Sequence, residues 1–229
     1  MTYSAMVLGA TGNVGGRIVE LLVESPRCQR VIVVVRRHTG AFGNAKITEL
    51  VVDMDRLEEQ VGPHARGVDM ALAAFGVGSG SARLSADELR KIEVEYPRAF
   101  CRAAKAGGAR VCALMSAVGA NSDSAVRAIR VMGEKEQAGK DVGFDFLGLF
   151  RPGVILGNSN TPSMLNGMMP FVDWALPARF RSVHKNDLAR AMVVQSEQAL
   201  DAPAGGPRVK ALEFPQMKPF FVPGDRALR

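Results

Sequence analysis

The sequence is poor in the residues that bind metals and form redox pairs. It has three cysteines and three histidines, namely Cys28, Cys101, Cys112, His38, His64 and His184. The cysteine spacing fits neither a zinc site nor a CxxC pair, so we expect free, buried thiols. With so few histidines and no cysteine cluster, we expect no metal site.

Long hydrophobic runs are also missing. No apolar stretch approaches the ~18 residues that a membrane helix requires, so no membrane span is expected. The first residues, Met1-Thr2-Tyr3-Ser4, contain no basic segment followed by an apolar one, and a secretory signal is therefore not expected. Together with free thiols, these absences predict a cytoplasmic protein.

The charge is moderately basic, with a formal net charge of +6. A basic balance favours anionic partners, and a nucleotide cofactor satisfies it as well as a nucleic acid does. The arginines are scattered, with no run longer than Arg36-Arg37. We therefore expect no nucleic-acid binding.

Apolar segments alternate between two periodicities along the chain. Residues 5–8 and 31–35 are apolar throughout, and between them Val14, Ile18 and Leu22 recur at helical spacing. Strands that are apolar on both faces belong in a parallel sheet covered on both sides. Further strands are expected at 49–52, 68–75, 110–115 and 144–150, and helices at 86–106, 124–139 and 187–199, with Pro97 kinking or splitting the first of these.

This alternation predicts an α/β fold, a doubly wound parallel sheet of the Rossmann type with six or more strands and a small C-terminal substrate or lid region. Residues 1–229 are expected to form a single NAD(P)-binding domain, with 160–180 and 200–229 as lid or tail appendages. The proline-rich stretch 202–229 reads as a loop. Met164, Met168, Met169 and Trp174 are expected in the core or a lid, while a pocket lining or an oligomer contact stays open.

A glycine-rich turn lies between the first strand and the first helix. It reads Gly9-Ala10-Thr11-Gly12-Asn13-Val14-Gly15. Glycines at these positions allow a sharp turn and a close approach to a pyrophosphate, and the helix that follows points unpaired N–H groups at the phosphates. The turn predicts a dinucleotide site formed by Gly9, Thr11, Gly12, Asn13, Val14 and Gly15.

Two arginines follow the second strand. NAD-specific domains usually carry an acidic residue there, whereas this chain has Arg36-Arg37. Two guanidinium groups can hold a 2′-phosphate, which predicts NADP(H) as the cofactor. Asp53, followed by Met54, comes after the third strand and either bonds the adenine or caps a short helix.

The glycine turn, with GxxGxxG spacing, resembles that of the extended and atypical short-chain dehydrogenase/reductases. Further matching segments are 103–108, 115–120, 150–154 and 183–191, so the resemblance covers about residues 5 to 195. Within the superfamily the sequence is most similar to the Tat-interacting-protein oxidoreductases and the NmrA-like proteins.

The resemblance implies several roles. Phe75 and Gly76, after the fourth strand, would border the cofactor. Ser116 matches the catalytic serine, which in the parent family orients the substrate carbonyl. The segment Pro152-Gly153-Val154 would lie beside the nicotinamide.

The family's catalytic Tyr-x-x-x-Lys pair is missing. Ala128 stands at the tyrosine position and Met132 at the lysine position. The chain's two tyrosines, Tyr3 and Tyr96, both precede Ser116, so no shift of the alignment restores the pair. Because neither alanine nor methionine can donate a proton, the standard carbonyl-reductase mechanism is not expected.

Two interpretations remain open. In one, the protein is an oxidoreductase-like NADP(H)-binding protein that needs no tyrosine, with Ser116, Tyr96 or His184 as conceivable proton donors and an unknown small molecule as substrate. In the other, it is a non-catalytic NADP(H) sensor or scaffold that acts through a protein partner. A monomer and a homodimer are both compatible with the sequence. Asp87, Glu88, Glu93 and Glu95 on the expected long helix read as a solvated face.

Overall fold

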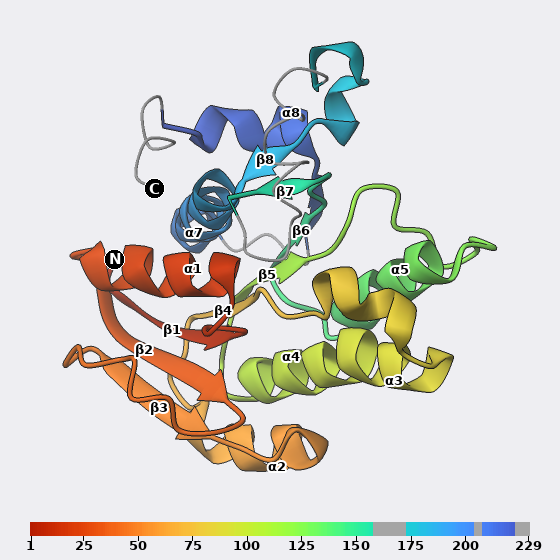
Figure 1. Cartoon of the computed structure of the whole chain (residues 1–229). Coiled ribbons are helices and arrows are strands. Elements are labelled where there is room, and N and C mark those ends of the chain that lie inside the picture. The colour runs from red at the N-terminus through yellow and green to blue at the C-terminus, as the bar shows by residue number, and fades with distance from the viewer. Residues whose placement is uncertain (158–172, 204–207, 223–229) are drawn as a thin grey trace.

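A parallel β-sheet with helices on both faces organises the chain (Figure 1). The computed structural model describes residues 1–157, 173–203 and 208–222. Seven strands follow the spatial order β3-β2-β1-β4-β5-β6-β9, and every neighbouring pair is parallel. They are β1 (Tyr3–Leu8), β2 (Cys28–Val35), β3 (Ile47–Val51), β4 (Met70–Ala73), β5 (Val111–Met115), β6 (Phe146–Phe150) and β9 (Arg208–Leu212). The predicted Rossmann-type fold is confirmed.

The described helices pack in three hydrophobic clusters, and the two larger ones lie on opposite faces of the sheet. On one face α1 (Asn13–Glu24) and α7 (Lys185–Asp201) pack together through residues such as Ile18, Leu22 and Met192. On the other face α2 (Leu57–Val61) and α4 (Tyr96–Ala106) bury Leu57 and Phe100. Figure 1 shows these pairs on opposite sides of the sheet. The strand order reverses between β1 and β4, which places the crevice of this fold at their carboxyl ends.

The expectation of a loop over 202–229 is wrong for residues 208–217, while residues 204–207 and 223–229 lie outside the described part of the chain. Strand β9 extends the sheet beside β6, and α8 (Phe214–Met217) follows it. Four of the five residues of β9 are exposed, so its sequence lacks the apolar pattern that identifies the inner strands. A separate two-stranded ribbon joins β7 (Ile155–Leu156) to β8 (Val183–His184). The three methionines Met164, Met168 and Met169 lie outside the described residues, and Trp174 is 78% exposed, so it is not in the core.

The expected long helix at 86–106 has three parts. An α-helical turn, α3 (Ala86–Arg90), leads into a π-helical segment, Lys91–Glu95, and then into α4. Pro97 lies just after the wide turn. Its ring would clash with the carbonyl of residue 93 in a regular α-helix, and a wider turn accommodates it. The predicted kink at Pro97 therefore takes the form of a π-turn.

The helix expected at 124–139 begins later. Helix α5 spans Arg127–Lys140. The side chain of Ser124 accepts a hydrogen bond from the Val126 N–H, which holds this segment in a turn in place of a helix.

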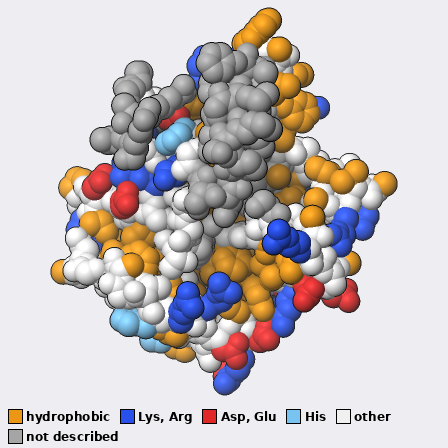
Figure 2. Space-filling view, viewed as in Figure 1, with side chains coloured by type: hydrophobic (Ala, Val, Ile, Leu, Met, Phe, Trp, Pro, Cys, Tyr) orange, Lys and Arg blue, Asp and Glu red, His pale blue; other side chains and the backbone are white. Residues whose placement is uncertain are grey.

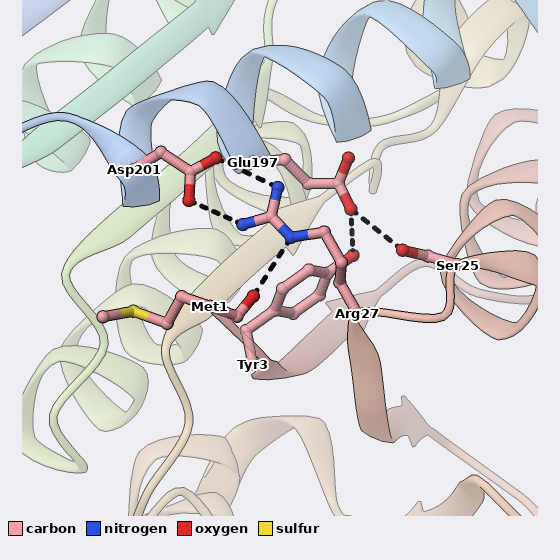
Figure 3. Close-up of polar contacts among 6 residues, drawn as sticks. All are labelled: Met1, Tyr3, Ser25, Arg27, Glu197 and Asp201. Carbon is pink, nitrogen blue, oxygen red and sulfur yellow. Dashed lines mark hydrogen bonds and ion pairs between the residues drawn. The ribbon is translucent and has the colours of Figure 1, made fainter.

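The N-terminal strand is fastened to the last turns of α7 by polar contacts (Figure 3). The Tyr3 hydroxyl donates to Glu197 Oε1 at 2.6 Å, and the Ser25 hydroxyl donates to the same oxygen at 3.0 Å. Arg27 forms two hydrogen bonds with Asp201, at 2.7 and 3.0 Å. Burial and the hydrogen bond to Glu197 raise the pKa of Tyr3 well above the ordinary tyrosine value. These contacts hold β1, from which the glycine turn leaves, against α7.

A Tyr3→Phe substitution tests this fastening. We expect the free energy of unfolding to fall by about 1–2 kcal/mol at pH 7, because a hydrogen bond to a carboxylate is lost. In the wild type, Tyr3 stays protonated in the folded state and ionises above pH ~10 in the unfolded state. The difference in the free energy of unfolding between the wild type and Tyr3→Phe should therefore decrease by about 1 kcal/mol as the pH rises from 10 to 11. Urea unfolding at both pH values measures it, and a difference that widens would contradict the assignment.

Candidate functional site

The glycine turn makes the closest main-chain approach at the crevice. Gly9 has a φ of +88°, and a Cβ there would lie 2.4 Å from the Ala74 carbonyl oxygen after β4. A Cβ on Gly15 would lie 2.0 Å from the Gly9 carbonyl oxygen. Both positions require glycine, because the opposing atoms are backbone and cannot move aside cheaply. The turn thus fixes α1 directly behind β1 and against the end of β4.

The N-terminus of α1 has neither a side-chain cap nor a nearby acidic residue in its first turn. Gly12 is its N-cap residue. The N–H groups at a helix N-terminus carry the positive end of the helix dipole. This end of the helix borders two cavities, and a third cavity shares lining residues with both of them.

One cavity, of about 770 Å³, lies between the glycine turn and the end of β2. Thr11, Gly12, Arg36 and Arg37 line it. Both arginine side chains are exposed, and in the described part of the chain neither forms an ion pair. Figure 2 shows Lys and Arg side chains bordering the hydrophobic side chains gathered on this face.

A second cavity of about 670 Å³ shares Arg36 with the first. Asp53, Met54, Phe75 and Gly76 also line it. The Asp53 side chain accepts a hydrogen bond from the Asp55 N–H, so it caps the short helix, as one of the two expectations held. Because it also borders the cavity, the other expectation stays a prediction.

A third cavity of about 340 Å³ opens where β5 and β6 end. It brings together seven of the residues expected to bind the cofactor or the substrate, which are Asn13, Val14, Phe75, Gly76, Ser116, Pro152 and Gly153. Gly9 and Gly15 lie inside the turn and Val154 pairs with Val183, so these three line none of the cavities described. Ala128 and Met132 line the third cavity as well, on the side formed by α5.

The buried carboxylate of Glu136 accepts a hydrogen bond from Ser116. The Ser116 hydroxyl donates to Glu136 Oε1 at 2.7 Å, and Glu136 accepts two further hydrogen bonds from Arg151 at 2.7 and 2.5 Å. The hydrogen bonds to Glu136 raise the pKa of the Arg151 guanidinium. Glu136 is 2% exposed, so Arg151 and Ser116 are the groups that satisfy it.

A second buried ion pair forms part of the same cavity wall. Lys135 Nζ donates to Glu93 Oε2 at 3.0 Å and to the Phe75 carbonyl at 2.8 Å, and Glu93 Oε1 accepts from the Val77 N–H at 2.8 Å. A Cβ on Gly76 would lie 2.6 Å from Glu93 Oε1. The pair therefore holds the loop 75–77 by its main chain.

This pair corrects the interpretation of the acidic cluster as a solvated face. Asp87, Glu88 and Glu95 are exposed, but Glu93 is 4% exposed. Glu93 lies four residues after the buried Leu89, so it falls on the buried face of the helical repeat, and only its charge suggested a solvated position. Sequence reasoning also missed Lys135 and Glu136 on α5, although they share one helix face with Ala128 and Met132.

The other proposed proton donors lie apart from Ser116. The Tyr96 hydroxyl donates to Asp55 Oδ1 at 2.7 Å and borders the second cavity, and burial raises its pKa. His184 Nδ1 accepts from the Asn186 N–H and caps α7. His38 contacts Glu49, and His64 is exposed. Within the described ranges no three metal-ligating side chains cluster, and no helix there has the length and apolar character needed to cross a bilayer.

Gly15→Ala and Gly16→Ala form a matched pair that tests the turn. We expect Gly15→Ala to lower the free energy of unfolding by about 3 kcal/mol, because its methyl group has no room. A Cβ on Gly16 lies 3.5 Å from the Ala10 carbonyl oxygen, which is ordinary contact. Gly16→Ala should stabilise the protein by up to ~1 kcal/mol through helix propensity. Thermal unfolding measures both, and equal effects would contradict the described packing.

Comparisons with known proteins extend these observations. No family model matches the chain. It is 35% identical to the mitochondrial protein FMP52 of Candida albicans over 157 residues, which cover 67% of this chain and 68% of that protein. It is 30% identical to HTATIP2 of Rattus norvegicus over 157 residues, or 67% of this chain and 63% of that protein.

Solved structures share the fold at low identity. The enzyme WbmH of Bordetella bronchiseptica, in complex with NAD⁺, superposes with a TM-score of 0.68 at 15% identity, covering 93% of this chain and 76% of that one. A short-chain dehydrogenase of Burkholderia cenocepacia, in complex with NADP, gives a TM-score of 0.63 at 15% identity, covering 92% and 89%.

The relatives' names overturn the expectation of a cytoplasmic protein. The FMP52 proteins of several fungi are named as mitochondrial. The expectation rested on the lack of a secretory segment and of disulfide-type cysteine spacing. Proteins of the cytoplasm and of mitochondria can both lack these two features, so the features do not distinguish the two locations.

Proposed function

The chain belongs to the atypical short-chain dehydrogenase/reductases, in the branch of FMP52 and HTATIP2, and on that premise we propose that it binds NADP(H) and acts as an oxidoreductase without the Tyr-x-x-x-Lys pair. The observation that carries the proposal is the glycine turn, where two cavities meet at the N-terminus of a helix that has no side-chain cap. When bound, the coenzyme supplies or accepts hydride.

The residues present fit this coenzyme. Gly12 and the first N–H groups of α1 would hold the pyrophosphate. Arg36 borders the two cavities on the adenosine side, so one guanidinium can serve both the adenine and a 2′-phosphate, with Arg37 as the second cation. Pro152 and Gly153 would border the nicotinamide end.

A double substitution Arg36→Ala/Arg37→Ala tests the choice of NADP(H). We expect the Kd for NADPH to rise about a hundredfold, since two charge-assisted hydrogen-bonding groups are lost, and the Kd for NADH to change little. Coenzyme fluorescence titrations at low salt measure both constants.

Arg30→Ala is the matched control for these titrations. Arg30 lies on the same strand, and its side chain bonds the Arg66 carbonyl at 3.1 Å, away from the cavities. Its removal should leave both constants unchanged. An equal increase in the Kd for NADPH and the Kd for NADH in the double variant would contradict the proposed 2′-phosphate site.

The proposed chemistry differs from carbonyl reduction because α5 presents Ala128 and Met132 to the cavity. Neither side chain donates a proton. Two buried contacts hold the surroundings of this cavity in place. Lys135 and Glu93 bind the main chain of the loop 75–77, and Glu136 orients Ser116.

Restoring the pair tests this account. We expect the wild type to reduce aldehydes with NADPH no faster than background, and Ala128→Tyr/Met132→Lys to raise the rate at least about tenfold, since a positioned acid contributes 10²–10⁴-fold in favourable cases. Ala128→Phe/Met132→Leu fills the same space without an acid and should stay at background. Absorbance of the nicotinamide band follows the reaction, and aldehyde turnover by the wild type would contradict the account.

The alternative is a sensor that binds NADP(H) and signals through a partner. The loss of both catalytic side chains favours it. A panel of quinones, flavins and secondary alcohols, each with the appropriate coenzyme form, distinguishes the two. Turnover above background excludes a sensor-only role, while no turnover together with unequal affinities for NADP⁺ and NADPH contradicts the enzymatic proposal.

A further inference from the structure

One short segment lies between the cavity at the ends of β5 and β6 and the cavity that Asp53 lines. This segment, residues 77–84, is called the strap below. Gly78 and Ser81 line the first of these cavities, of about 340 Å³. Three other residues of the strap line the second, of about 670 Å³, namely Val77, Gly80 and Leu84. A dinucleotide that occupies both cavities must therefore pass along the strap.

The ends of the strap are fastened by burial, whereas its middle lacks apolar anchors. At one end the Val77 N–H donates to Glu93 Oε1 at 2.8 Å, and at the other end Leu84 packs against a small buried cluster around Leu89. Residues 78–83 read Gly-Ser-Gly-Ser-Ala-Arg, so they supply no large apolar side chain to a core. The position of the middle therefore depends on hydrogen bonds.

Arg127, the first residue of α5, fastens this middle part. Its Nη1 donates to the Leu84 carbonyl at 3.1 Å, and its Nη2 donates to the Ser81 carbonyl at 3.3 Å. Among the residues that the structure describes, no other side chain forms a hydrogen bond with 78–84. A cation in the first turn of a helix gains nothing from the helix dipole, which favours acids there. The benefit of a guanidinium at this position therefore comes from its bonds to the strap.

We propose that Arg127 is a positioning residue that latches the strap against the bound coenzyme, so that opening of the latch limits coenzyme release. The proposal rests on the proposed function, because it concerns the same coenzyme. A planar guanidinium that bonds two carbonyls at once fixes the direction of the main chain between them. Without Arg127 the strap is attached at its ends alone, and its open form becomes more populated.

Limited trypsin digestion measures the opening of the strap, because Arg83 lies within it and is exposed. The rate of cleavage after Arg83, followed by mass spectrometry of the fragment 1–83, reports the population of the open form. Arg127→Ala should raise this rate about tenfold relative to the rate of cleavage elsewhere in the chain. Saturating NADP⁺ should lower it in the wild type.

Stopped-flow fluorescence provides a second readout. We expect Arg127→Ala to raise the dissociation rate constant of NADPH about tenfold and to change the association rate constant little. A residue that only stabilises the fold would leave both rate constants of the folded protein unchanged. The division between the two constants therefore separates a latch from a structural role.

Arg130→Ala is the matched control. Arg130 lies three residues further along α5, and its Nη1 donates to the Ser124 carbonyl at 3.0 Å, so its removal should leave cleavage after Arg83 and NADPH dissociation unchanged. An unchanged dissociation rate constant of NADPH in Arg127→Ala would overturn the proposal, even if cleavage is faster. If the wild type binds neither NADP⁺ nor NADPH, the proposed function fails together with the role of the strap in coenzyme release. Failure of the latch alone differs from this, because NADPH then binds and dissociates equally fast from both variants.

Discussion

The contact of main chain with main chain at the crevice is the constraint on which the rest depends. Gly9 and Gly15 leave no room for a side chain, so the turn after β1 lies directly on the end of β4 and on the first turn of α1. This packing brings an uncapped helix N-terminus, the arginines after β2 and the cavity at the ends of β5 and β6 to one edge of the sheet. A bulkier turn would separate these groups, and no single site would result.

Two buried ion pairs then order the surroundings of that edge. Lys135 and Glu136 are neighbours on α5, yet Lys135 holds the loop 75–77 through Glu93, whereas Glu136 joins Ser116 to Arg151. Burying such charges costs desolvation energy, so pairs of this kind are weak arguments for stability. Their contribution here is positional, since each fixes a group that lines the same cavity. These buried contacts therefore surround the cavity that Ala128 and Met132 line.

Much of this could be predicted from the sequence where the physical signal is local. Uniformly apolar runs predicted the inner strands, and the glycine turn between a strand and a helix predicted the position of the crevice. Strand β9 was not predicted because Arg208–Leu212 is a mostly exposed edge strand that is defined by its pairing with β6. The burial of Glu93 was missed because its charge suggested exposure, although it shares a helical face with the buried Leu89, and that of Glu136 was missed because its partner Arg151 is 15 residues away. Contacts of that kind depend on the fold, and no local pattern encodes them.

The central claim is that the turn and the open helix end form a site for a phosphorylated dinucleotide. Isothermal titration calorimetry of the full chain with NADP⁺ and with NADPH tests it most directly. We predict saturable heat with a stoichiometry of about one coenzyme per chain for at least one of the two forms. The absence of binding heat with both forms at millimolar concentration would contradict the account.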